Sequence, residues 1–332
     1  MNWKKALTLS LFFAIGVFLF WKTITIIPED ERPRIWEDMV SAPKWAIMMS
    51  FIMGLLAIVS RGLRWLLLLE PMGYSPSRFR SVCAVAFGYL SNTFVPRSGE
   101  IVRCATLKST DDIPVNKLIG TVITERVVDF IMLFLFMSVA LLTNLDAVIR
   151  LLSKIPFPGG SVFQNSMIAF VLILLLILIV FIMKRINKSD NPLQKKIAHF
   201  LSGIGQGIKS VLSMKNRTAF IIHTFFIWIM YFLMSYGLYK SMNGSSGIDI
   251  FESIWVMVSG GFGMVFPSPG GVGSYQLAVA LGFESLEYEY TVGVSVGNVV
   301  WLTQTIMIII SGALAYIYLS AYRFSLKKSK PE

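Results

Sequence analysis

The sequence predicts an all-α polytopic membrane protein, with about six spanning helices and two re-entrant helical hairpins in an inverted repeat. Hydrophobic residues occupy 55% of the 332 positions and charged residues only 15%, whereas soluble domains carry about 25% charged residues. Several apolar runs reach the roughly 20 residues that cross a bilayer. The net charge of +11 comes from basic residues that concentrate in a few loops and at the chain ends. That distribution orients a membrane protein and does not indicate nucleic-acid binding.

The first part of the chain predicts two spanning helices, over 6–27 and 44–70. The first follows a basic start, but no small-residue cleavage site follows its apolar run, so we interpret it as an uncleaved helix rather than a signal peptide. The acid-rich stretch 28–44 is expected to be a loop. The second helix carries Arg61 and Arg64 on one face. We favour snorkelling of these two side chains to the cytoplasmic interface over contact with a substrate.

A helical hairpin is expected next. Residues 81–95 are apolar but short for a spanning helix, and a Pro-Arg-Ser-Gly-Glu turn and a mixed helix over 101–107 follow them. We interpret this stretch as a hairpin that enters the membrane and turns back near Pro96. A long spanning helix over 114–143 comes after it.

The middle of the chain supplies the strongest orientation marker. The loop 144–161 includes a candidate interfacial amphipathic helix, and 162–183 is a clean spanning helix. The loop 184–217 is rich in lysine and arginine, so it is expected on the cytoplasmic side, against anionic headgroups. In the following helix, 218–241, we favour a packing role for His223 over a role as a proton carrier.

The last part repeats the organisation of the first. Residues 251–266 are apolar and again short, a Pro-Gly-Gly turn and a second apolar limb follow, and the final spanning helix covers 288–319. We therefore expect a single membrane domain over 1–332, with a first repeat at 44–143 and an inverted second repeat at 218–319.

The two interrupted segments align with each other. Pro96 pairs with Pro267 and Gly99 with Gly270, which is the sequence pattern of a transporter with repeats around a binding site. If both segments re-enter, both termini and the basic loop 184–217 fall on the cytoplasmic side. If each crosses once, that loop falls outside. We favour re-entrance, although two short helices can also tilt and cross.

Charged side chains in the first hairpin and the helix after it form the principal candidate site. A charge at membrane depth costs at least about 2.5–3.5 kcal/mol, so it usually has a partner or faces a wet cavity. Arginine forks suit phosphate, and carboxylates hold such forks in place. We favour an anion site, for example for a lipid headgroup, over an ion-pair network that only pins the hairpin. Replacing Arg97 by alanine is expected to abolish activity. The candidate residues are Arg97, Glu100, Arg103, Glu125, Arg126 and Asp129.

The second turn is a weaker candidate. Its backbone N–H groups stand at a helix start and suit an anion, although a simple flexible turn explains it equally well. Gln276, just beyond it, is a candidate to line a polar path. No phosphate-binding loop, nucleophile elbow or metal motif is present in the sequence, so we expect no cofactor and no metal. A lipid-modifying enzyme stays open, because Glu125 or Asp129 is able to act as a base.

Three motifs carry a family resemblance: FVPRSGEIVRCATL, ITERVVD and FPSPGGVGSYQ. With them, residues 10–320 resemble the flippase-like family that includes the transmembrane region of lysylphosphatidylglycerol synthases. The resemblance implies paired re-entrant segments and an activity that moves a lipid, or a lipid-linked headgroup, between leaflets. The positions that match the family's two motifs are Arg97, Gly99, Glu100, Arg103, Glu125, Arg126, Asp129, Pro269, Gly270, Gly271 and Gly273.

Two departures limit that resemblance. Full synthases carry a soluble aminoacyl-transfer domain after the membrane part, whereas this sequence stops at Glu332, so we do not expect lipid aminoacylation. The family often has glutamate near Gln276, and the neutral amide puts proton coupling there in doubt.

The sequence therefore predicts a lipid flippase in a bacterial cytoplasmic membrane. The protein is expected to bind anionic lipids. A membrane enzyme acting on a lipid or polyprenyl phosphate and a non-transporting scaffold remain as alternatives. Expected partners are membrane lipids, a second copy of the chain or a separately encoded lipid-modifying enzyme.

Overall fold

A computed structural model describes residues 3–153, 211, 214–265 and 268–328. Within these ranges the regular structure is helical and contains no strand. The helices, including two short 3₁₀ turns, are α1 (Trp3–Thr25), α2 (Arg32–Ser41), α3 (Lys44–Leu69), η1 (Glu70–Met72), α4 (Arg78–Phe94), α5 (Gly99–Asp111), α6 (Val115–Thr143), α7 (Leu145–Ser153), α10 (Arg217–Ser241), α11 (Ile250–Val265), η3 (Pro269–Gly271), α12 (Ser274–Ser285) and α13 (Tyr290–Lys328).

Long apolar helices confirm the helical membrane protein. In the described part of the chain, 4 helices are long and apolar enough to cross a membrane: Lys44–Met72, Val115–Thr143, Arg217–Ser241 and Tyr290–Leu326. They match four of the expected spans. The apolar part of α1 is shorter, at Phe12–Thr25, and the expected span at 162–183 lies outside the described residues. The expected count of about six spans is therefore not confirmed.

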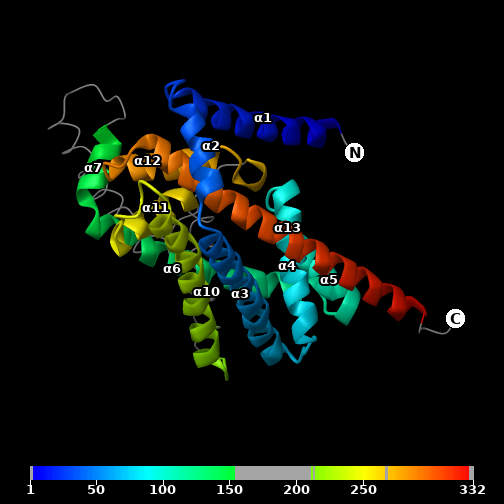
Figure 1. Cartoon of the computed structure of the whole chain (residues 1–332). Coiled ribbons are helices and arrows are strands. Elements are labelled where there is room, and N and C mark those ends of the chain that lie inside the picture. Colours follow the sequence, from blue (N-terminus) through cyan, green and yellow to red (C-terminus); the bar gives the residue numbers. More distant parts are fainter. Residues whose placement is uncertain (1–2, 154–210, 212–213, 266–267, 329–332) are drawn as a thin grey trace, which may run out of the picture.

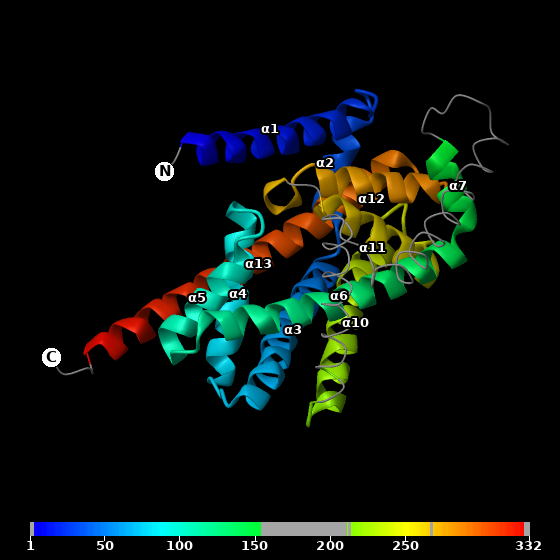
Figure 2. The same ribbon diagram turned by 180° about the vertical axis from the view of Figure 1, so that it is seen from behind.

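A pair of short helices lies at each place where a hairpin is expected, and re-entrance of either pair into the bilayer stays a prediction. In the first, α4 packs against α5 and the turn falls at Val95–Ser98; in the second, α11 packs against α12 across η3 (Figures 1 and 2). Glycine permits the close approach in the first hairpin, because a Cβ at Gly99 would collide with the carbonyl oxygen of Gly88. Whether the hairpins enter the bilayer from opposite sides stays a prediction.

The order of elements is the one that two repeats require. A long helix, two short helices and a long helix follow one another in α3–α6 and again in α10–α13. The contacts between the halves are reciprocal: α4 packs on α13 and α11 packs on α6, while α3 and α10 lie side by side (Figure 1). The inverted orientation of the two halves remains a prediction.

The expectation of a plain loop over 28–44 is wrong, because α2 occupies much of it. Two of the acidic side chains that suggested a loop, Glu31 and Asp38, accept hydrogen bonds from α13. Thr291 donates to Glu31 at 2.8 Å and Ser295 donates to Asp38 at 3.2 Å. These hydrogen bonds hold α2 along α13, so the charges lie at a helix–helix contact.

Two smaller expectations correspond to what the structure shows. A helix is present in the predicted amphipathic stretch: α7 packs on α12, and Arg150 Nε donates to the carbonyl of Ser285 at 2.7 Å. His223 is half-buried, and its Nδ1 lies 2.8 Å from Ser60 Oγ, as expected of a packing histidine.

Candidate functional site

Helices α3, α5 and α6 bring charged side chains together inside the protein. We call this group the charged cluster, and it contains four arginines and three carboxylates. Spacing explains the local arrangement, since residues three or four apart share one face of a helix. The members of the charged cluster are Arg61, Arg64, Glu100, Arg103, Glu125, Arg126 and Asp129.

The centre of the charged cluster is buried. Asp129 Oδ1 accepts a 2.8 Å hydrogen bond from Arg64 Nη2, and its Oδ2 lies 2.9 Å from Arg61 Nη2. Glu125 is paired with Arg103 and lies 3.6 Å from Arg64 Nη2. Each of these five residues is buried. Charges in such a place persist only because they are paired, and removing one partner leaves an uncompensated charge.

The edge of the charged cluster is wetter. Arg126 Nη2 lies 3.1 Å from Glu100 Oε1, and its other amino group lies 4.0 Å from Asp129. Half of the Arg126 side chain, 50%, is exposed, so this guanidinium is accessible from outside. The cluster thus runs from a buried centre on α6 to an open edge.

The expectation that Arg61 and Arg64 snorkel to the interface is wrong. Their exposed fractions are only 4% and 0%. Carboxylates on α6 lie opposite them, and Arg64 also donates to Thr224 at 3.1 Å. Sequence spacing shows that two arginines share a face of α3, but only the packing of α3 against α6 shows what that face meets.

Arg97 does not join the charged cluster. It is exposed in the turn between α4 and α5 and has the left-handed φ of 65°. Among the described residues it takes part in no ion pair. The other predicted charged residues of this region do come together, and Gly99 keeps the two helices of the hairpin close.

Several buried arginine N–H groups in the charged cluster have no partner in the described part of the chain. They are Nε and Nη1 of Arg61, Nε of Arg64 and Nε of Arg103, and two carboxylate oxygens of the cluster, Glu125 Oε1 and Asp129 Oδ2, also make no hydrogen bond there. Arg61 and Arg103 line a small cavity of about 20 Å³, together with Arg126 and Asn92. A buried donor without an acceptor costs about 1–3 kcal/mol, more when it is charged. With four guanidinium groups against three carboxylates, the cluster attracts an anion.

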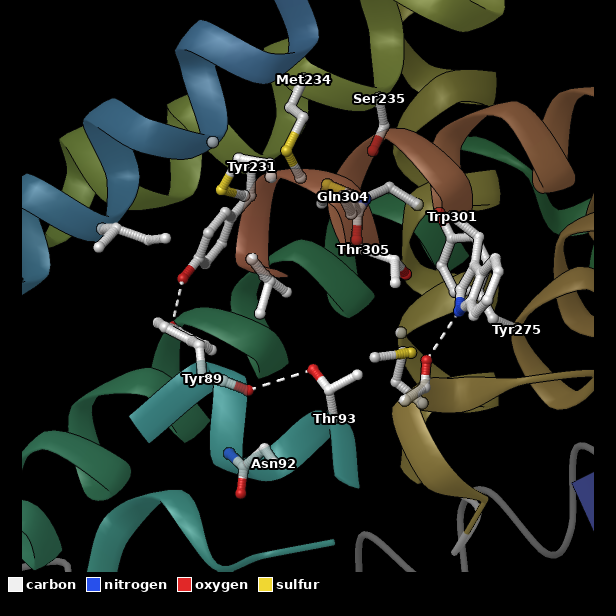
Figure 3. Close-up of a pocket in the computed structure, with 18 of the residues that line it drawn as sticks. Tyr89, Asn92, Thr93, Tyr231, Met234, Ser235, Tyr275, Trp301, Gln304 and Thr305 are labelled. Atoms are coloured by element: carbon white, nitrogen blue, oxygen red, sulfur yellow. Dashed lines mark hydrogen bonds between the residues drawn. The ribbon is translucent and has the colours of Figure 1, made fainter. Parts of the chain in front are cut away.

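Figure 3 shows a larger chamber of about 420 Å³. Tyr89 and Asn92 line both this chamber and the small cavity, so the two spaces share part of their walls. The hydroxyl of Tyr89 lies 3.0 Å from that of Tyr231, which lines the chamber. The other walls of the chamber are mostly apolar and include the flexible side chains Met234, Met257, Met264 and Met307.

The second turn borders the chamber, and no ion pair joins its described residues to the charged cluster. Gly270 lines the chamber, and its carbonyl accepts a 2.7 Å hydrogen bond from Trp301 Nε1 (Figure 3). Three glycines there have φ between 60° and 76°, a left-handed conformation that favours glycine. Pro269 begins η3, and the glycines are Gly270, Gly271 and Gly273.

Gln276 serves the local structure of this turn. It is buried, with 1% exposed, and its Oε1 accepts a 2.8 Å hydrogen bond from the N–H of Gly273. This bond caps the start of α12, and a glutamate carboxylate there would accept the same bond. Gln276 does not line the central chamber; it lines a different cavity, to which Trp301 also contributes.

Sequence reasoning missed part of this site. Arg61, Arg64, Tyr89 and Tyr231 were not among the predicted site residues. For the arginines a signal existed, because two charges beside a tryptophan in an apolar run are costly unless they are paired. For the tyrosines nothing in the sequence distinguishes them from packing residues. In the described part of the chain, no group of three histidine, cysteine or carboxylate side chains is arranged to hold a metal ion.

Comparison with known proteins gives one family. A family model described as the lysylphosphatidylglycerol synthase TM region matches residues 7–312. No curated protein matches the chain. No solved structure matches it either.

Proposed function

The chain belongs to the family of the lysylphosphatidylglycerol synthase transmembrane region, and from that premise we propose that it moves a phospholipid, or a lipid-linked anionic headgroup, between the leaflets of a membrane. The observation that carries this proposal is the set of unpartnered N–H groups on Arg61 and Arg103, buried beside a largely apolar chamber. A lipid is an amphiphile, so its binding site needs hydrogen-bond donors for the headgroup next to an apolar space for the hydrocarbon.

The charged cluster supports binding of the headgroup. Guanidinium groups present planar forks that match phosphate oxygens in two places at once. Glu125 and Asp129 already hold most of the arginine guanidinium groups in place. An incoming phosphate therefore meets preorganised donors. Arg126, exposed at the edge, is placed to meet the headgroup first.

The chamber supports binding of the hydrocarbon. Its volume of about 420 Å³ falls in the range of ligand pockets, roughly 300–1,000 Å³. It lies between the turns of the two hairpins, since Thr93 comes from the first and Gly270 from the second (Figure 3). In this proposal the hairpins re-enter from opposite sides of a bacterial cytoplasmic membrane, with the basic loops and both termini in the cytoplasm.

A leaflet-exchange assay in proteoliposomes tests the proposal. Purified protein is reconstituted with a panel of headgroup-labelled lipids, and a membrane-impermeant reagent destroys the label in the outer leaflet. We expect protein-dependent loss of the inner-leaflet label for an anionic lipid. Arg61→Gln should reduce that rate at least tenfold, because it removes the buried unpartnered donors. Arg34→Gln, on the exposed edge of α2, is the matched control and should behave as wild type.

The outcomes separate the proposal from its alternatives. No movement of any lipid, with unchanged lipid masses, contradicts transport and favours a scaffold. A lipid of altered mass in the extract favours a membrane enzyme. If correctly inserted Arg61→Gln protein transports lipid at the wild-type rate, the charged cluster is not part of the binding site.

A further inference from the structure

A second cavity lies on the far side of Trp301 from the central chamber. Its volume is about 410 Å³, and helices α1, α2, α12 and α13 contribute its walls. We propose that this cavity binds the ester-linked acyl segment of a membrane glycerolipid. The inference concerns a site separate from the charged cluster and does not depend on movement between leaflets.

The walls of the cavity suit hydrocarbon. Phe20 and Ile24 of α1 face Ile35 and Met39 of α2 across it, with Leu302 of α13 beside them. Its volume again lies in the range of ligand pockets, roughly 300–1,000 Å³.

The mouth of the cavity carries an interfacial aromatic residue. Trp36 of α2 lines the cavity, yet 68% of it is exposed. Tryptophan is the residue that membrane proteins place at the level of the headgroups. This exposed tryptophan fits a cavity that opens at the level of the headgroups, where the ester junction of a lipid lies.

Two buried amides give the cavity its chemical selectivity. Asn298 is 6% exposed and Gln276 is 1% exposed, and both line the cavity. The carboxamide of Asn298 makes no hydrogen bond to a described residue. Gln276 uses its Oε1 to cap α12, which leaves its amide N–H₂ group. Both amides line the cavity among apolar walls, so an acceptor from a ligand is favoured here.

Arg32 at the cavity edge already has two partners. Its Nε donates to the carbonyl of Ile27 at 3.1 Å, and its Nη1 lies 3.3 Å from Glu29. The other polar groups named here, the amides of Asn298 and Gln276, are neutral and surrounded by hydrocarbon. An ester carbonyl, a neutral acceptor at the end of an acyl chain, fits both features. The charged cluster, with four guanidinium groups, offers phosphate a better place.

Trp301 is the partition between this cavity and the central chamber, since it lines both. Only one indole, held by its 2.7 Å hydrogen bond to the carbonyl of Gly270, stands between the two spaces at that point. A lipid in the second cavity is therefore a neighbour of any lipid in the chamber, while its own contacts stay distinct.

The test compares ester and ether lipids. Purified protein in detergent is titrated with diacyl phosphatidylglycerol or with its dialkyl ether analogue, and bound lipid is counted by native mass spectrometry. We expect the diacyl lipid to bind about tenfold more tightly, or about 1.4 kcal/mol, because the ether analogue has no carbonyl to accept hydrogen bonds from the two amides. Asn298→Leu keeps the side-chain size and removes the amide, so it should reduce this preference by several-fold.

Controls locate the effect and separate it from transport. Arg61→Gln protein should keep the ester preference, even though its headgroup site is impaired. Leu314→Asn places the same amide on an exposed position of α13 and should leave the preference unchanged. A free fatty acid that displaces the diacyl lipid would show that the site recognises a carboxylate and would overturn the ester assignment.

Equal binding of ester and ether lipids by wild-type protein would also overturn the inference, as would an unchanged preference in folded Asn298→Leu protein. Folding of each variant is checked by size-exclusion chromatography and thermal unfolding. An ester preference that persists in protein without leaflet exchange would contradict only the proposed function.

Discussion

The two hairpins have the same architecture and opposite chemistry. Each consists of two short helices around a turn that contains proline and glycine, and each packs on the last long helix of the other half. The first hairpin contributes Glu100 and Arg103 to the charged cluster. The second carries no charged residue between Ser253 and Phe283. Two hairpins of the same architecture therefore differ in role. The first contributes charged side chains, and the second contributes an uncharged turn to the wall of the chamber.

The difference also shows what each hairpin depends on for stability. The first is held to α6 by two ion pairs, a buried one between Arg103 and Glu125 and a partly exposed one between Glu100 and Arg126. The second is held by backbone geometry, because its glycines adopt conformations that favour residues without a side chain. Four substitutions test this contrast, in order of decreasing expected effect.

Asp129→Asn should have the largest effect, since it leaves Arg61 and Arg64 buried with too little negative charge. Breaking a buried pair from one side costs about 3–5 kcal/mol. The measurement is thermal unfolding in detergent. Glu289→Gln, which breaks an exposed 2.8 Å pair with Arg34, should cost less than about 1 kcal/mol. Equal losses in the two variants would show that burial does not control the strength of these pairs.

Gly273→Ala in the second hairpin should lower the free energy of unfolding by about 2–4 kcal/mol. The φ of 76° is unfavourable for alanine, and the new Cβ would clash with the backbone of α1 at Gly16. Gly99→Ala in the first hairpin clashes without an unfavourable φ, so its cost should be smaller. Gly120→Ala is the control, because nothing lies near its Cβ and α6 should gain up to about 1 kcal/mol. Unfolding in urea ranks the three. The contrast fails if Gly99→Ala is the most damaging.

Trp301→Phe should cost about 1–2 kcal/mol, because it leaves the carbonyl of Gly270 without its donor. Trp65→Phe is the counterpart in the first half, where it removes a buried 2.8 Å hydrogen bond to Thr121. Both keep an aromatic ring, so the loss of packing is similar. Differential scanning fluorimetry with an external dye measures both. An unchanged melting temperature in either variant would show that its hydrogen bond contributes nothing to stability.

Arg97→Ala should have the smallest effect on stability, within about 0.5 kcal/mol, because the side chain is exposed and outside the charged cluster. Its effect on leaflet exchange therefore reports function directly. Loss of exchange in this stable variant would support the role in lipid capture that the sequence predicts. Wild-type exchange would confine headgroup binding to the charged cluster.

Much of the fold follows from local signals. The long apolar runs predicted α3, α6, α10 and α13, and the proline and glycine residues predicted both hairpin turns. The helix α2 was missed, since its acidic face is explained only by donors on α13. Of the candidate site, the positions on α5 and α6 were predicted because charge in an apolar helix is conspicuous.

The sequence by itself determined where helices form, where they break and which helices carry charge, because those properties depend on neighbouring residues and on the energy of placing a charge in a membrane. The tertiary structure alone decided which charges meet. Arg61 and Arg64 acquired their roles only when α3 packed on α6, far away along the chain. The chamber and the second cavity were likewise decided by packing, because a cavity is the space that several helices leave between them and no single segment encodes it.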